Sequence, residues 1–184
     1  MDAGALLRPG LLDGRVVALG GGAGGALAAP LAALGAATSV LPSKLDEDAM
    51  AAAVDPRTDA LVHDLRPAFA DGLRAALDLA WVTLRAVANA AFIPEAGSGG
   101  KIVVVAPAPE RASPPVVGAR AAAENLARTL SIEWARHGIT TVAITPGVDS
   151  DDAQLATLAA YLASPAGDYF SGCRLALGET AVTV

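Results

Sequence analysis

The chain has 184 residues, of which 53% are hydrophobic, and a formal net charge of −6. This length suffices for one domain with a full core, expected over residues 1–184, and the negative charge with scattered arginines argues against a nucleic-acid-binding surface. The single cysteine, Cys173, excludes an internal disulfide, and the N-terminal residues lack the pattern of a signal peptide, so a cytoplasmic protein is expected. The longest apolar stretch, 77–93, contains charged and amide side chains and is judged too short and too polar to span a membrane.

Short apolar runs alternate along the chain with longer helical patterns. Strands are predicted over residues 15–19, 37–41, 60–63, 101–105, 140–144 and 174–177. Helices are predicted over residues 26–34, 45–54, 71–92, 119–137 and 152–163. Because strands that alternate with helices form parallel β-α-β units with right-handed crossovers, the pattern predicts one doubly wound, Rossmann-like α/β domain. Its parallel sheet should have about six strands, in the order 2-1-3-4-5-6.

The turn after the first predicted strand is rich in glycine. Gly20, Gly22 and Gly25 have the G-x-G-x-x-G spacing, directly after a strand and directly before a helix, which is the setting of a dinucleotide-binding turn. Without side chains, the backbone N–H groups can approach a pyrophosphate at the start of a helix. Gly24 offers a second register for the motif, and the alternative is a flexible turn that binds no nucleotide. Pro30 is expected near the end of the first helical turn, where its missing N–H costs little.

The second predicted strand ends without the acidic residue that usually binds ribose hydroxyls about 20 residues past the glycines. Leu41, Pro42, Ser43 and Lys44 stand there instead. Ser43 and Lys44 could face a 2′-phosphate, which would favour NADP over NAD, and the alternative is a solvated loop. Binding of NAD or NADP is therefore expected to be weak or lost.

The segment from Val116 to Gly147 reads VVGARAAAENLARTLSIEWARHGI followed by TTVAITPG. Its long amphipathic helix, and its buried strand that ends in Pro-Gly, resemble the second half of a short-chain dehydrogenase/reductase (SDR), a family of NAD(P)-dependent oxidoreductases. That family places a tyrosine four residues before a lysine on this helix, a serine after the preceding strand, and an asparagine on the earlier long helix. The corresponding positions of this chain hold Val116, Arg120, Pro107 and Asp78.

These substitutions remove the chemistry that the resemblance implies. Val116 can neither donate nor accept a proton, Pro107 has no hydroxyl, and Asp78 cannot offer the amide that holds a relay water. Arg120 keeps a positive charge that could touch a ribose or a phosphate, but no phenol remains for it to activate. The resemblance therefore implies a catalytically degenerate SDR homologue that acts as a scaffold or partner subunit.

The alternative is an NAD(P)-dependent oxidoreductase with an unconventional active site. His63 and Asp64 follow the third predicted strand, where the resembled family has Asn-Asn-Ala-Gly, and they could act together with Arg120. Adjacent strand residues point to opposite faces of a sheet, however, which leaves one of the two for a structural role. The chain also has no room for the edge strand that flanks the adenine in the family, nor for the helical lid that closes over substrate.

The two long predicted helices, 71–92 and 119–137, are the elements with which the resembled family pairs its subunits. Apolar positions cover more than one face of the second helix: Leu126, Leu130, Ile132 and Trp134. A helix that is apolar beyond one stripe needs a second partner. A homo-oligomer, or a hetero-oligomer with an active SDR paralogue, is therefore expected. The alternative is that this apolar surface is ordinary core.

Overall fold

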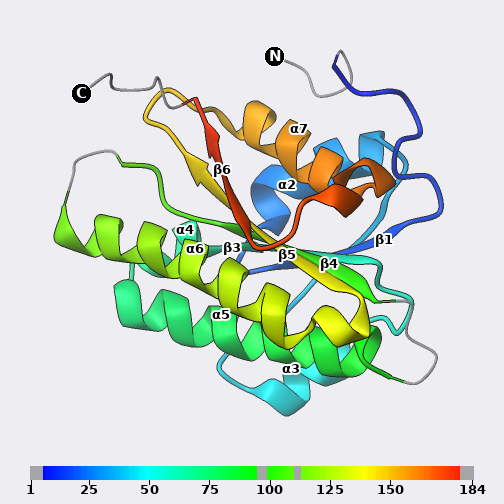
Figure 1. Cartoon of the computed structure of the whole chain (residues 1–184), viewed down its shortest axis with the longest axis horizontal. Helices are drawn as coiled ribbons and strands as arrows, with labels where there is room; N and C mark the ends of the chain where they lie inside the picture. The colour runs from blue at the N-terminus through cyan, green and yellow to red at the C-terminus, as the bar shows by residue number, and fades with distance from the viewer. Residues whose placement is uncertain (1–5, 95–98, 110–112, 179–184) are drawn as a thin grey trace.

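The computed structural model describes residues 6–94, 99–109 and 113–178. It contains a six-stranded, all-parallel sheet in the order β2-β1-β3-β4-β5-β6, which confirms the predicted fold class and strand order (Figure 1). The strands are β1 (Val16–Gly20), β2 (Ala37–Val40), β3 (Ala60–Asp64), β4 (Gly100–Val105), β5 (Ile139–Pro146) and β6 (Cys173–Leu177). The strand order reverses between β1 and β3, which is where a crevice forms at the carboxyl edge of such sheets.

Helices cover both faces of the sheet. They are α2 (Gly24–Ala33), α3 (Glu47–Ala53), α4 (Leu65–Phe69), α5 (Leu73–Val87), α6 (Pro114–Glu133) and α7 (Asp152–Ala163). Three shorter helical turns are η1 (Ala88–Phe92), η2 (Ala135–His137) and η3 (Pro165–Tyr169). Helices α3, α5 and α6 pack on one face, and α2 and α7 on the other (Figure 1), because successive apolar strand residues such as Leu61 and Val62 point to opposite faces.

The start of α6 and the presence of α4 differ from the sequence prediction. α6 begins at Pro114 rather than at residue 119, because Ser113 is extended and proline is favoured in the first turn of a helix. Residues 110–112, which precede this helix in the sequence, lie outside the described residues. The short helix α4 was not predicted, and it begins directly after β3 because the Asp64 carboxylate accepts the backbone N–H of Arg66 at 2.9 Å.

Pro30 lies in the interior of α2, which corrects its expected place near the end of the first turn. The helix begins at Gly24 rather than at Ala26, so the proline falls further from the helix start. A proline at this position leaves the carbonyl of Ala26 without its helical N–H donor. The helix continues to Ala33 and then ends as expected at Gly35, whose φ of 100° permits the left-handed turn.

One helical stretch, Leu73–Phe92, has the length and apolar composition of a membrane span, with 20 residues and a mean hydropathy of 1.2. The sequence-based judgement that the apolar stretch is too short and too polar for a span is therefore wrong, because the helical stretch in the structure is longer than residues 77–93. Half of this stretch is buried inside the domain, and Ala76, Ala80 and Leu84 are among its buried residues. This is the packing of a core helix against a sheet.

Candidate functional site

The glycine turn lies at the carboxyl end of β1, where the strand order reverses. Gly21 and Gly22 have positive φ angles of 68° and 88°, which a side chain would strain. A Cβ atom on Gly21 would come within 2.1 Å of the carbonyl oxygen of Asp64, and one on Gly22 within 3.1 Å of Pro67. The close approach of β1 to the start of α4 therefore requires both glycines, with or without a ligand.

The other glycines that the sequence assigned to a cofactor are Gly20, Gly24 and Gly25, and they differ in whether neighbouring atoms occupy the space of a Cβ atom. A Cβ atom on Gly20 would lie 2.8 Å from Nδ1 of His63, and one on Gly24 would lie 2.8 Å from Val40. Only Gly25 meets nothing within 4 Å. The packing of the chain itself thus explains most of the glycine pattern, and one position faces open space.

The start of α2 keeps the features that attract an anion. Ala23 provides no side-chain cap, and the first turn holds no acidic residue, so the positive end of the helix dipole is uncompensated. After β2, Ser43 and Lys44 are exposed, and the next carboxylate, Asp46, accepts the N–H of Ala49 at 3.0 Å and caps α3. The residues present fit a phosphate group at the helix start, while residues 37–45, which form β2 and the turn after it, include no acidic residue for the ribose.

Pro107 and Arg120, two of the positions that the sequence aligned with catalytic residues of the SDR family, meet at the carboxyl ends of β4 and β5. Val116 and Arg120 lie one turn apart on α6, and Pro107 lies buried just past β4. Nη1 of Arg120 donates to the carbonyl oxygen of Pro107 at 3.0 Å and to that of Pro146 at 2.6 Å. The guanidinium therefore bridges the backbones of two neighbouring strands at the edge where an SDR enzyme holds its substrate.

Asp78 lies outside this cluster. It belongs to α5, its side chain is 46% exposed, and it accepts a hydrogen bond from Nε of Arg74 at 3.0 Å. The same carboxylate borders a surface groove between α5 and α6, together with Trp81 and Leu126. Its surroundings are those of a surface ion pair rather than of a proton relay.

His63 and Asp64 end β3 but have separate environments. His63 is fully buried, neither of its ring nitrogens has a hydrogen-bond partner among the described residues, and burial lowers its pKa to about 4. Asp64 is 3% exposed and binds the guanidinium of Arg66, with Nη2 of the arginine 2.8 Å from Oδ2 of the aspartate. As expected for neighbours on a strand, the two side chains form no pair.

Arg66 is a residue of this edge that the sequence did not single out. Besides Asp64, its guanidinium binds Asp152 in the first turn of α7, with Nη1 and Oδ1 2.7 Å apart. Burial lowers the pKa of Arg66, but hydrogen bonds and charge attraction from the two carboxylates outweigh burial, so that its pKa is raised. The ion pairs join α4 to α7. The sequence shows the Asp-x-Arg spacing of residues 64–66. The contact with Asp152 could not be predicted from it, because the two residues are 86 positions apart and meet only in the folded domain.

No protein-family model matches this sequence, and no curated protein matches it either. Solved structures do match. The citronellol catabolism dehydrogenase AtuB of Pseudomonas aeruginosa PAO1 is 21% identical, with a TM-score of 0.73 over 94% of this chain and 96% of that chain. A short-chain dehydrogenase/reductase from Serratia marcescens BCRC 10948 is 20% identical, with a TM-score of 0.69 over 92% of this chain and 97% of that chain.

A third similar structure is the NADH-dependent enoyl-[acyl-carrier-protein] reductase of Aquifex aeolicus VF5, which is 17% identical. Its TM-score is 0.72 over 90% of this chain and 95% of that chain. All three similarities extend over nearly the whole chain, at identities that inform on the fold alone. The chain therefore has the fold of the short-chain dehydrogenase/reductase family, as its sequence predicted.

Proposed function

We propose that this chain is a catalytically degenerate SDR homologue that serves as a non-catalytic scaffold or partner subunit of an oxidoreductase. The observation that carries the proposal is the place of Arg120, whose guanidinium donates to the carbonyl oxygens of Pro107 and Pro146. In the family that the fold resembles, this position holds the lysine that activates a phenol. Here the residue one turn earlier is Val116, and reduction of a carbonyl requires an acid within hydrogen-bond reach of its oxygen.

Neither tyrosine of the chain stands in for the missing acid. Tyr161 lies on α7 and packs edge-on against Phe170, with the ring centroids 6.0 Å apart. It belongs to the core on the α2 and α7 side of the sheet, whereas α6 packs on the opposite side. Tyr169 is 94% exposed in η3. A scaffold role agrees with both positions.

The alternative remains an NAD(P)-dependent oxidoreductase with an unconventional active site. It would use His63, the buried imidazole beside the glycine turn, with Asp64 and Arg120. His63 is fully buried, and Asp64 is held by Arg66, so both side chains would have to move before they could reach a substrate. The present geometry therefore favours the non-catalytic reading.

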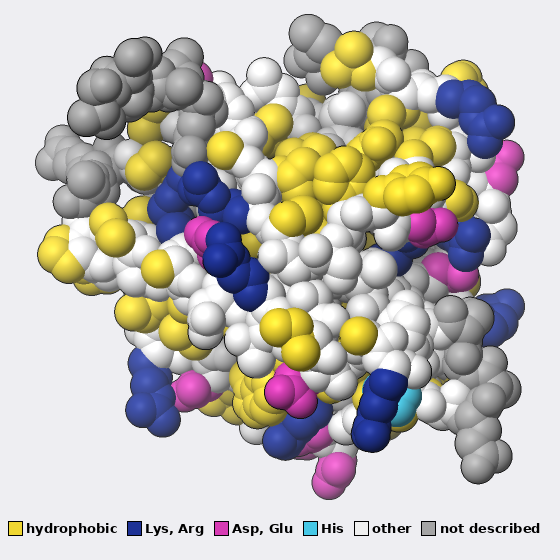
Figure 2. All heavy atoms as spheres, in the orientation of Figure 1, with side chains coloured by type: hydrophobic (Ala, Val, Ile, Leu, Met, Phe, Trp, Pro, Cys, Tyr) yellow, Lys and Arg dark blue, Asp and Glu magenta, His cyan; other side chains and the backbone are white. Residues whose placement is uncertain are grey.

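The proposed subunit contact is the surface formed by α5 and α6. A groove of about 350 Å³ between them is lined by Leu77, Asp78, Trp81, Ala122, Asn125 and Leu126. Trp81 is 42% and Val117 57% exposed, and Figure 2 shows hydrophobic side chains on this face among charged ones. Leu130, in contrast, is only 3% exposed and belongs to the core of one subunit. Exposed apolar surface of this kind marks interaction sites, so we assign it to a homo-oligomer or to a hetero-oligomer with an active SDR paralogue.

Cofactor binding and turnover together test the proposal. Since the carboxyl edge offers a phosphate contact at the start of α2 and no acidic residue at the end of β2, over residues 37–45, we expect NAD or NADP to bind weakly or not at all. The test is a fluorescence titration with NADH and NADPH, followed by an assay of carbonyl reduction.

A cytoplasmic location, favoured by the single cysteine, is part of the same proposal.

A further inference from the structure

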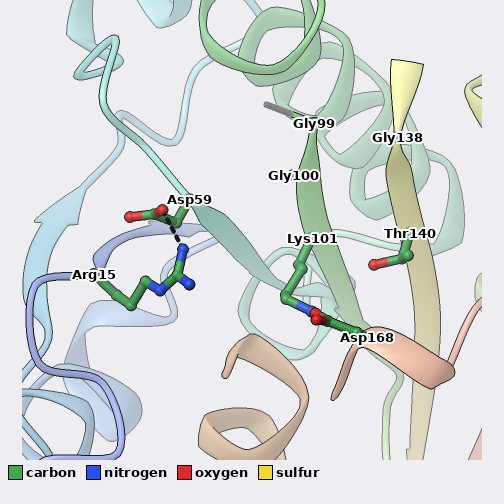
Figure 3. Close-up of a pocket in the computed structure, with 8 residues that line it drawn as sticks. All are labelled: Arg15, Asp59, Gly99, Gly100, Lys101, Gly138, Thr140 and Asp168. Atoms are coloured by element: carbon green, nitrogen blue, oxygen red, sulfur yellow. Dashed lines mark hydrogen bonds and ion pairs between the residues drawn. The ribbon is translucent and has the colours of Figure 1, made fainter. Parts of the chain in front are cut away.

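A cavity of about 400 Å³ opens at the amino edge of the sheet (Figure 3). Its lining comes from the starts of β1, β3, β4 and β5 and from η3: Arg15, Asp59, Gly99, Gly100, Lys101, Gly138, Thr140 and Asp168. The glycine turn and Arg120 lie at the carboxyl edge, which is where cofactors of doubly wound sheets bind. The cavity is therefore separate from the candidate site described above.

Arg15 is held in place beside the cavity. Its Nη1 donates to Oδ1 of Asp59 at 2.7 Å, and the backbone N–H of Val16 donates to Oδ2 of the same aspartate at 2.8 Å. Both carboxylate oxygens are thus engaged, which fixes the orientation of the guanidinium. A guanidinium has five N–H donors, and the contact with Asp59 uses one of them. Arg15 therefore combines a fixed position with unused donors, on the side of the cavity that faces Lys101 in Figure 3.

Lys101 supplies a second cation, whose present partner can be replaced. Its side chain is only 14% exposed, and its ammonium pairs with the carboxylate of Asp168 on η3. Asp168 is 62% exposed, and an ion pair with an exposed carboxylate is only slightly more stable than the separated, hydrated charges. A ligand carboxylate or phosphate can therefore take the place of Asp168. The hydroxyl of Thr140 also points into the cavity (Figure 3) and adds a third donor.

The glycines keep the cavity open. A Cβ atom on Gly99 would lie 2.3 Å from the carbonyl oxygen of Gly138, and one on Gly100 would lie 2.3 Å from the ring of Phe92. Gly99 and Gly138 also have positive φ angles of 80° and 69°. Backbone packing thus imposes small residues here, and no side chain from these positions fills the space between the two cations.

We propose that this cavity binds a small organic oxyanion, a phosphate ester or a carboxylate, with its charged group between Arg15 and Lys101 and within reach of Thr140. The volume lies in the range of small-molecule sites, about 300–1,000 Å³, and exceeds the need of a lone ion. Both oxygens of Asp59 are engaged, and once a ligand replaces Asp168 beside Lys101, the side chains of Arg15, Lys101 and Thr140 can donate to it. The lining holds two cations and two carboxylates, so displacement of Asp168 leaves a net positive charge, which together with these donors favours an anion.

An NMR titration with inorganic phosphate and with succinate tests this site, each against sodium chloride at equal ionic strength. We expect saturable shifts of the backbone amides of Gly99, Gly100 and Gly138 with at least one of the two oxyanions. Saturation by phosphate alone assigns a phosphate-bearing ligand, and saturation by succinate alone assigns a carboxylate. Shifts no larger than those produced by chloride, for both anions, overturn the proposal.

Substitutions separate a binding site from general charge effects. Arg15→Gln should weaken binding about tenfold or more, because a charge-assisted donor is lost. Asp168→Asn should tighten it several-fold, because Lys101 loses its competing carboxylate. Arg57→Gln is the matched control, since Arg57 is 81% exposed and pairs with Asp55 outside the cavity lining. An equal loss in Arg57→Gln and Arg15→Gln, or weaker binding in Asp168→Asn, contradicts the proposal. Lys101→Met, which leaves the Arg15–Asp59 pair in place, gives a second test of lost binding if Arg15→Gln does not fold.

Discussion

Arg120, at the position that the sequence aligned with the catalytic lysine of SDR enzymes, binds the backbone. A lysine ammonium is a compact, strongly hydrated point charge, whereas the planar fork of a guanidinium presents several donors in a fixed arrangement. Arg120 donates to the carbonyl oxygens of Pro107, which follows β4, and of Pro146, which ends β5. The side chain therefore stabilises the carboxyl edge of the sheet, where an enzyme would keep its reactive groups available to substrate.

Arg120→Met should lower the free energy of unfolding by about 1–3 kcal/mol, because two partly buried carbonyl oxygens lose their charged donor. Arg128→Met is the matched control on the same helix. Arg128 is 63% exposed and forms an i,i+4 ion pair with Glu124, so its loss should change stability by less than about 0.5 kcal/mol. Urea unfolding of both variants measures the difference, and equal effects would show that the contacts of Arg120 do not stabilise the fold.

His63 should make the domain less stable as the pH falls from 7 to 5. Burial lowers the pKa of His63 from 6.5 to about 4, so between these values the unfolded chain binds the proton and the folded chain does not. The contribution of His63 to the free energy of unfolding is therefore fully present above about pH 6.5 and is lost below it, by about 2 kcal/mol at pH 5. His63→Leu should remove most of this dependence. Urea unfolding of wild type and variant at both pH values checks it, and parallel losses in the two proteins would contradict the assignment.

At the scale of elements, the glycine turn and α4 form one packed unit. The start of α4 lies against the turn so closely that Gly21 faces the carbonyl of Asp64 and Gly22 faces Pro67. The pattern that reads as a nucleotide motif is thus also the pattern that this packing requires. A glycine motif therefore predicts a close backbone approach more reliably than it predicts which molecule approaches.

Two alanine substitutions separate these requirements. Gly21→Ala should destabilise the domain by more than about 1 kcal/mol, because φ is 68° and a Cβ atom would lie 2.1 Å from the Asp64 carbonyl oxygen. Gly25→Ala should leave stability unchanged or raise it by about 0.5–1 kcal/mol, because this helical position is open. Thermal or urea unfolding of the two variants provides the comparison. Similar losses in both would argue against the proposed packing.

The sequence predicted the regular elements well where periodicity or strand composition is strong. The buried runs of β3 and β4 and the long α5 and α6 were all expected from local patterns. The five-residue α4 was not, because it is too short for a periodic signal and depends on the Asp64 cap and on the distant contact between Arg66 and Asp152. The resemblance to the SDR family singled out positions 107, 116 and 120. The hydrogen bonds of Arg120 could not be predicted, because their carbonyl acceptors, Pro107 and Pro146, come together only when the sheet has formed.

At the scale of the whole molecule, one sheet carries surfaces suited to different roles. Its carboxyl edge holds Arg120 and the glycine turn, its amino edge holds the charged cavity, and α5 and α6 present apolar side chains beside their groove. The proposed pairing surface lies on the helices and not at the carboxyl edge, so the proposed loss of catalysis would leave that surface intact.

Assembly through the α5 and α6 surface is sensitive to a charge in its groove. Leu126→Asp should dissociate the oligomer or cause aggregation, because it would bury an unpaired carboxylate in the contact. Val148→Asp is the control, since Val148 is 62% exposed and does not line this groove. Sedimentation velocity compares the variants with wild type. A wild-type chain that sediments only as the 18.2 kDa species at high concentration would contradict the proposed contact.

The most direct test of the central claim is turnover by the wild-type chain with NADH or NADPH on a panel of ketone and aldehyde substrates, alongside an active SDR enzyme as a positive control. We expect no carbonyl reduction above the uncatalysed rate, since a positioned acid alone contributes about 10²–10⁴-fold. Restoring Val116→Tyr and Arg120→Lys together should not recover activity, because Pro107 still lacks the serine hydroxyl. Clear turnover by the wild-type chain that is lost in Arg120→Ala would contradict the account and establish an oxidoreductase with an unconventional active site.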